Sequence, residues 1–144
     1  MKFLLDIITP QRKAFSEEVD AVTVPTPEGL IEVLAHHEAL FTSLAEGELK
    51  ISAAGKQYFL AIGGGFMEVR PHGTVTILVS RAVHADEVNE AEIKKAMESA
   101  KSLIARKVTG DELVTALATL RRSILELKVA KRRKTHPFGG SVSS

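Results

Sequence analysis

The sequence predicts an α+β protein in which an antiparallel β-sandwich or barrel is followed by an antiparallel hairpin of two helices. Up to about residue 80, short β-prone runs are separated by glycine and proline turns, which is typical of sandwiches and barrels. Beyond about residue 87 there is no proline before Pro137, and the only glycine in that interval is Gly110. Apolar residues there recur every three to four positions, which indicates amphipathic helices. We therefore expect a β-domain over residues 1–85, a helical hairpin over 86–134 and a disordered tail over 135–144.

The β-domain is predicted from a series of short segments. The clearest is 19–24, where apolar and polar residues alternate with the period of a half-buried strand until Pro25 ends it. The glycine triplet at 63–65 precedes another strand-like run. A β-bulge or tight bend is therefore preferred to a phosphate-binding loop, which would open a helix. The other predicted strands are 2–8, 12–15, 29–34, 48–52, 57–62, 66–70 and 74–79.

Two helical segments follow, separated by a break at Val108, Thr109 and Gly110. Asp111 is suited to cap the second helix, because a short acidic side chain accepts hydrogen bonds from free backbone N–H groups. A hairpin of about 50 residues cannot bury a core of its own, so it must pack on the β-domain, on a partner, or on each in turn. The first helix is predicted from Ile93, Ala96, Ala100, Leu103 and Lys107, and the second carries a narrow apolar seam of Leu113, Leu117, Leu120, Ile124 and Leu127.

Composition bounds the class of protein. The chain has 144 residues, of which 44% are apolar and 26% charged, as in ordinary soluble globular proteins. No run of about 18 apolar residues is present, so no segment is expected to insert in a membrane. The first residues are interrupted by Asp6 and Pro10, which does not fit a signal peptide. The absence of cysteine excludes disulfides and thiol catalysis and agrees with a reducing cytoplasm.

Charge is distributed unevenly. From residue 121 onward seven basic residues face one acidic residue, giving +6, which leaves −5 for the first 120 residues of a chain with net charge +1. This pattern predicts an acidic partner for the basic end, or an attraction to the acidic body. Nucleic acid is disfavoured because the overall charge is near neutral, and a membrane-surface helix would carry bulky aromatic residues. The basic residues that we expect to make the contact are Arg121, Arg122, Lys128, Arg132 and Arg133.

No catalytic or metal site is predicted. The adjacent His36 and His37 would point to opposite faces of an extended segment, and no set of carboxylates at ligand spacing accompanies them. A structural or interface role is therefore preferred. No Gly-x-Ser-x-Gly elbow is found, and the scattered acidic residues are most simply solvated. We expect a protein that is not an enzyme by itself.

The order of these motifs resembles the epsilon subunit of rotary ATP synthases over nearly the whole chain, from Phe3 to about Arg133. The family pattern has a strand ending in Thr-Pro, an alternating strand, Glu-Gly followed by a histidine loop, and Gly-Gly-Phe-x-Glu-Val. The matching runs in this sequence are IITP at 7–10, AFS at 14–16, VDAVTVP at 19–25, EG at 28–29, VLAHHEAL at 33–40, GGFMEV at 64–69 and VTIL at 75–78.

The resemblance implies a non-catalytic rotor subunit of a bacterial, proton-driven ATP synthase. Its β-domain would bind the gamma subunit and the membrane ring of c subunits at the cytoplasmic face of the plasma membrane. Its hairpin would fold on the β-domain or extend beside gamma, where the basic helix contacts the catalytic alpha and beta subunits and inhibits ATP hydrolysis. The loop expected to face the c-ring or gamma contains Glu28, Gly29, Glu32 and His37.

Some members of the family bind regulatory ATP through a Leu-Asp-x-x-Arg-Ala motif at the start of the first helix. Here Asn89 stands in place of the aspartate and Glu92 in place of the arginine, so we expect weak or no ATP binding and no cofactor. Two alternatives to the rotor subunit were considered. One is a free-standing β-domain that binds a small ligand or metal and dimerises through its hairpin, and the other, less favoured, is a hydrolase.

Overall fold

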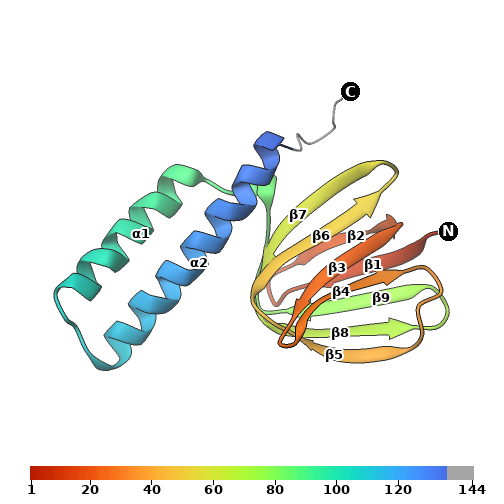
Figure 1. The fold of residues 1–144 in the computed structure, drawn as a ribbon, viewed down its shortest axis with the longest axis horizontal. Helices are drawn as coiled ribbons and strands as arrows, with labels where there is room; N and C mark the ends of the chain where they lie inside the picture. The colour runs from red at the N-terminus through yellow and green to blue at the C-terminus, as the bar shows by residue number, and fades with distance from the viewer. Residues whose placement is uncertain (136–144) are drawn as a thin grey trace.

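The computed structural model describes residues 1–135, so the expected tail lies almost entirely outside the described residues. Two five-stranded sheets pack face to face as a β-sandwich, and two helices follow (Figure 1). The first sheet has the strand order β2-β1-β9-β8-β5, and the second has the order β10-β7-β6-β3-β4. The strands are β1 (Phe3–Ile8), β2 (Lys13–Val19), β3 (Ala21–Thr26), β4 (Gly29–Leu34), β5 (Leu40–Leu44), β6 (Gly47–Ala53), β7 (Lys56–Ile62), β8 (Gly65–Arg70), β9 (Thr74–Val79) and β10 (Ala82–His84).

The predicted fold class is confirmed, and the strand pairs are antiparallel except for β1 and β9, which run parallel. The predicted single strand 19–24 is wrong, because the chain changes sheet at Asp20. The Asp20 N–H donates to the carbonyl of Ser52 (2.8 Å), and its carboxylate accepts from the N–H of Ala54 (2.9 Å). Val19 therefore ends β2, which is longer than the predicted 12–15, and Ala21 begins β3. The short strands β5 and β10 were not predicted.

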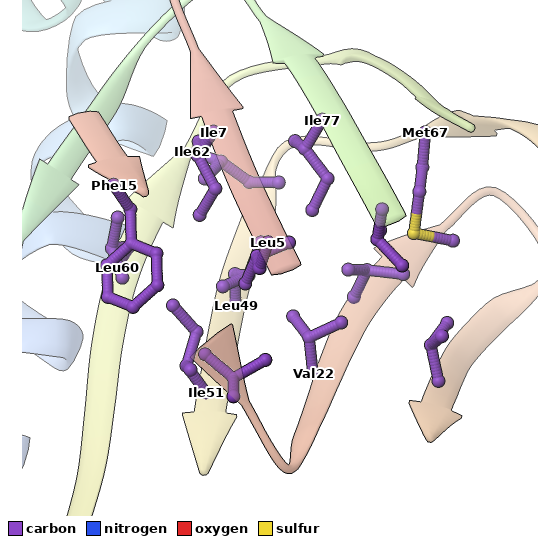
Figure 2. Close-up of a cluster of buried hydrophobic side chains, with 14 of the residues drawn as sticks. Leu5, Ile7, Phe15, Val22, Leu49, Ile51, Leu60, Ile62, Met67 and Ile77 are labelled. Carbon is purple, nitrogen blue, oxygen red and sulfur yellow. The ribbon is translucent and has the colours of Figure 1, made fainter. Parts of the chain in front are cut away.

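The core lies between the two sheets. Alternate side chains of each strand point inward, as the two-residue period of a strand requires. Figure 2 shows Leu5 and Ile7 of β1 beside Leu49 and Ile62 of the opposite sheet. These four side chains are fully buried. Their burial fixes which face of each strand is left for other contacts.

The hairpin consists of α1 (Glu90–Ala105) and α2 (Gly110–Thr135), joined to β10 through a 3-10 turn, η1 (Ala85–Glu87). The helix α2 begins one residue before Asp111 and extends one residue beyond the predicted end. Figure 1 shows α2 beside the sandwich and α1 on its outer side. In the structure the hairpin packs on the sandwich, which is one of the placements that the sequence left open. The apolar contact is small and consists of Phe59, Ala61, Ala85, Val129 and Leu125.

The predicted seam of α2 is wrong in part. Leu117 and Ile124 are 46% and 56% exposed, although Leu113, Leu120 and Leu127 are half-buried. The helix packs against α1 and also against β7 and β6, so its buried face is wider than a coiled-coil seam and is rotated from it. The buried residues of this helix are Ala116, Ser123, Glu126, Val129 and Ala130.

Candidate functional site

A bidentate ion pair joins α2 to the second sheet. Arg132 donates hydrogen bonds from Nε and Nη2 to the two carboxylate oxygens of Glu48 on β6, both at 2.8 Å. Its guanidinium also lies over the ring of Phe59, 5.1 Å from the centroid. The hydrogen bond to Glu48 raises the pKa of Arg132 above its ordinary value. This two-pronged pair fixes both the position and the rotation of α2 on the sheet.

A second set of charges links the turns of the sandwich to α2. The carboxylate of Glu46 accepts from Arg121 on α2 (2.6 Å) and from Arg81 of the sandwich (2.9 Å). The Nε atom of Arg81 lies 3.6 Å from the carboxylate of Glu126, which is buried on α2. Burial would raise the pKa of Glu46, but the hydrogen bonds from Arg121 and Arg81 outweigh it, so the pKa is lowered. Positive and negative groups thus alternate across the interface.

The other predicted basic residues divide into two groups. Arg133 donates to the carbonyl oxygens of Ala85 (2.8 Å) and Val88 (3.3 Å) and pairs with Glu90 (3.1 Å). It therefore holds α2 against the segment that joins the sandwich to α1. Arg122 and Lys128 are exposed and form no ion pair with any residue between 1 and 133.

The segment between β10 and α1 is held by the sandwich itself. Arg12, in the β1–β2 turn, donates to both carboxylate oxygens of Glu87 at 2.7 Å and to the carbonyl of Ala82 at 2.9 Å. The hydrogen bond from Arg12 lowers the pKa of Glu87 to about 2. A ring nitrogen of His84 lies 2.7 Å from the carbonyl oxygen of Ala14. Both contacts tie η1 to the first two strands.

The four residues expected in one loop do not lie in one loop. Glu28 is in the β3–β4 turn, Gly29 begins β4, Glu32 lies within β4, and His37 is in the β4–β5 connection. The two connections are at opposite ends of β4, separated by about 17 Å for a six-residue strand. The four residues therefore lie along β4 and at its two ends, and their contact with a partner stays a prediction.

The loop around the two histidines is locally constrained. His36 has a φ of 67°, in the left-handed region, and a ring nitrogen of His37 lies 2.9 Å from the carbonyl oxygen of Glu38. Among residues 1–135, no three side chains of metal-ligand type are grouped closely enough to hold an ion. His37 therefore has a local backbone contact, and neither histidine belongs to such a group within residues 1–135.

Asn89 and Glu92 form the N-terminal cap of α1. The side-chain oxygen of Asn89 accepts from the N–H of Glu92 (3.2 Å), and its amide donates to the Glu92 carboxylate (3.3 Å). The two residues thus satisfy free groups at the start of the helix.

An apolar patch lies on the outer face of the first sheet. Phe41, Phe66 and Leu78 are 68%, 49% and 51% exposed. Phe66 pairs with Leu78 across β8 and β9, and the rings of Phe41 and Phe66 stack 5.7 Å apart at an interplanar angle of 16°. Contiguous exposed apolar side chains of this kind mark interaction surfaces.

Comparison with known proteins decides the family. Residues 2–85 match the family described as "ATP synthase, Delta/Epsilon chain, beta-sandwich domain". The chain is 42% identical over 137 residues to the ATP synthase epsilon chain of Dehalococcoides mccartyi, covering 94% of this chain and 97% of that one. The chain belongs to the ATP synthase epsilon chain family. It is a non-catalytic subunit, and the predicted resemblance is confirmed.

Solved structures resemble this epsilon chain in fold. A chain of the Euglena gracilis mitochondrial ATP synthase, from a structure of its OSCP/F1/c-ring part, matches with a TM-score of 0.64 at 26% identity, covering 93% of this chain and 80% of that one. A chain from the central stalk and c-ring of the Tetrahymena thermophila mitochondrial enzyme matches with a TM-score of 0.53 at 19% identity, covering 90% and 97%. In the described part of this epsilon chain, neither helix combines the length and apolarity needed to cross a bilayer.

Sequence reasoning missed the acidic half of the interface. Glu46 lies in the β5–β6 turn and Glu48 within β6, and Arg81, the other partner of Glu46, lies between β9 and β10. The excess negative charge of the first 120 residues indicated an attraction between the basic helix and the acidic body, but not which residues provide it.

Proposed function

We propose that the chain is a rotor subunit in the central stalk of a proton-driven bacterial ATP synthase, and that its hairpin inhibits ATP hydrolysis. The observation that carries the proposal is how α2 is held. Three ion pairs join α2 to the sandwich, namely Arg121 with Glu46, Arg132 with Glu48 and Glu126 with Arg81, whereas the apolar cluster is small. An interface of this kind exchanges one carboxylate partner for another at a modest change in free energy, as a switch between two states requires.

The sandwich is the proposed anchor. The patch of Phe41, Phe66 and Leu78 lies on the first sheet, while α2 covers part of the second. The patch therefore remains available for the gamma subunit whether or not the hairpin is packed down. The c-ring is the second proposed partner, reached by Glu28, Gly29 and Glu32 along β4 and by His37 as a separate contact. Such a subunit is peripheral, at the cytoplasmic face of the membrane.

The hairpin is the proposed brake. On release of α2, Arg121, Arg132 and Arg133 lose their present partners and join Arg122 and Lys128 on one basic helix. Acidic segments of the catalytic alpha and beta subunits would then replace the carboxylates of the sandwich. Val114, Leu117 and Ile124 of the same helix are exposed, so their apolar side chains can pack against a partner protein.

The test is ATP hydrolysis by the reconstituted catalytic complex with gamma and variants of this chain. Arg122→Glu with Lys128→Glu should relieve inhibition without releasing α2, because these two residues form no ion pair with residues 1–133 when α2 is packed down. Glu48→Gln should strengthen inhibition, because it loosens α2 from the sandwich. Binding to gamma should be unchanged in both.

Lys94→Glu with Lys95→Glu on α1 is the matched control for charge reversal and should leave hydrolysis unchanged. Hydrolysis that does not differ between the wild type and the Arg122/Lys128 variant would contradict the inhibitory role. Loss of gamma binding by the wild-type chain would contradict the stalk position itself.

A further inference from the structure

A groove of about 370 Å³ lies between α2 and the outer face of the second sheet. Pro25 of β3, Leu30 of β4 and Phe59 of β7 provide apolar lining, and Lys50 of β6 and Lys128 of α2 provide charge. The volume lies within the range of small-molecule sites, which combine apolar walls with a few polar groups that fix orientation. Neither Asn89 nor Glu92, which stand at the positions of the family's ATP-binding motif, lines it.

Among residues 1–133, the positive charge that lines the groove exceeds the negative charge paired with it. The one acidic residue of the lining is Glu48, and both of its oxygens are used by Arg132. Lys50 and Lys128 form no ion pair with any residue between 1 and 133. Two uncompensated ammonium groups at a concave surface raise the local concentration of anions.

The apolar lining selects among anions. Leu30 is 71% exposed, so a large apolar side chain stands open to solvent at the edge of the groove. Pro25 and Phe59 are already buried, so the gain comes from Leu30: a ligand that covers this side chain gains apolar burial that inorganic phosphate cannot provide. We propose that the groove binds a small organic anion with an apolar body, its carboxylate or phosphate lying between Lys50 and Lys128.

The position of the groove has a thermodynamic consequence. Lys128 belongs to the hairpin and Lys50 to the sandwich, so a ligand that contacts both binds only when α2 is packed on the sheet. Binding then stabilises that arrangement by linkage. An effect on ATP hydrolysis would rest on the proposed function, whereas binding itself does not.

The test is calorimetric titration of the full-length chain with octanoate, a carboxylate with an apolar body. Saturable binding of one octanoate per chain is expected. Lys50→Gln and Lys128→Gln should each weaken it about fivefold to tenfold, the effect of losing a charge-assisted hydrogen bond of roughly 1–1.4 kcal/mol at a partly exposed site. Lys131→Gln, an exposed lysine of α2 outside the groove, is the matched control and should bind as the wild type does.

Inorganic phosphate provides charge without an apolar body and should bind more weakly than octanoate. Absence of saturable octanoate binding overturns the proposal. So does equal binding by the wild type and both groove variants, or equal weakening by Lys131→Gln. Phosphate that binds as tightly as octanoate overturns the assignment of the apolar lining. Because the titration needs no ATP synthase, its failure is distinguishable from failure of the proposed function.

Discussion

Arg12 and Glu87 are joined by two parallel hydrogen bonds of 2.7 Å, although they are 75 residues apart in the sequence. One residue lies in the first turn of the sandwich and the other ends η1, the segment that leads to the hairpin. This pair belongs to the sandwich and does not involve α2. Arg133 of α2, by contrast, holds the carbonyls of Ala85 and Val88. Any movement of the hairpin is therefore expected to pivot after Glu87, at Val88 and Asn89.

The pair between Arg12 and Glu87 predicts a pH-dependent stability. The pKa of Glu87 is about 2 in the folded chain and has an ordinary value of 4.5, so its contribution is fully present above about pH 4.5 and is lost as pH falls toward 2. Glu87→Gln should lower the free energy of unfolding by about 1 kcal/mol near neutral pH, after allowance for solvent screening. The difference from the wild type should shrink as pH falls through this window.

Thermal unfolding of both proteins between neutral and acidic pH measures this difference. Glu18→Gln removes an exposed carboxylate that forms no ion pair among residues 1–133, and it should unfold as the wild type does near neutral pH. A difference between Glu87→Gln and the wild type that stays constant down to pH 2 would show that the pair does not stabilise the fold.

The pair between Arg132 and Glu48 predicts coupled effects on the packing of α2. Arg132→Gln or Glu48→Gln should each speed amide exchange in α2 about tenfold. Removing one partner leaves the other charge half-buried and unpaired, and we expect this to lower the free energy of opening α2 by roughly 1.4 kcal/mol. The double variant should lose less than the sum of the two, since the residues act as one unit. Lys131→Gln is the control, and additive losses in the double variant would exclude direct coupling.

The exposed aromatic pair predicts a partner contact. Phe66→Ser should weaken binding to the gamma subunit by about tenfold to a hundredfold, the effect of removing a central aromatic residue worth about 1.4–2.8 kcal/mol. The melting temperature should change little, because the side chain is half exposed. Leu30→Ser, at an exposed apolar residue of the other sheet, should leave gamma affinity unchanged. Surface plasmon resonance with immobilised gamma compares the three proteins.

Replacing glycine by alanine is expected to destabilise the fold at Gly65 but not at the neighbouring Gly64. A Cβ at Gly65 would overlap the carbonyl oxygen of Leu78 and lie 2.8 Å from the Cα of Val79. Gly65→Ala should therefore lower the free energy of unfolding by about 1–3 kcal/mol, as expected for overpacking. At Gly64 the nearest atom, the Leu44 carbonyl oxygen, is 3.4 Å away, so Gly64→Ala should be tolerated. Urea denaturation measures both, and equal losses would contradict the steric explanation.

Much of the fold was predictable because strand and helix periods are local. The failures have physical causes of two kinds. Val19 and Ala21 are both buried, so the alternation continues through Asp20 although the chain changes sheet there. The strand β5 was missed because Phe41 faces solvent, against the expectation that aromatic residues are buried.

The candidate site was harder to predict because it is formed by contacts that are distant in the sequence. The clustering of the basic residues of α2 was visible in the sequence, but Glu46 and Glu48 lie in the sandwich and carry no local signature. The separation of His37 from Glu28 depends on the course of β4 between them. Family spacing alone does not reveal that the two lie at opposite ends of one strand.

The parallel pairing of β1 and β9 bears on how the chain is synthesised. Leu4 pairs with Thr74, so the first strand to leave the ribosome needs a neighbour made 70 residues later, roughly 4–14 s at ordinary rates of synthesis. During that interval β1 has β2 on one side and an unfilled edge on the other. The two helices contact each other through residues close in sequence, and this pairing has no such delay. The β-sandwich, rather than the hairpin, is therefore the part of the nascent chain most exposed to mispairing and most in need of protection before it folds.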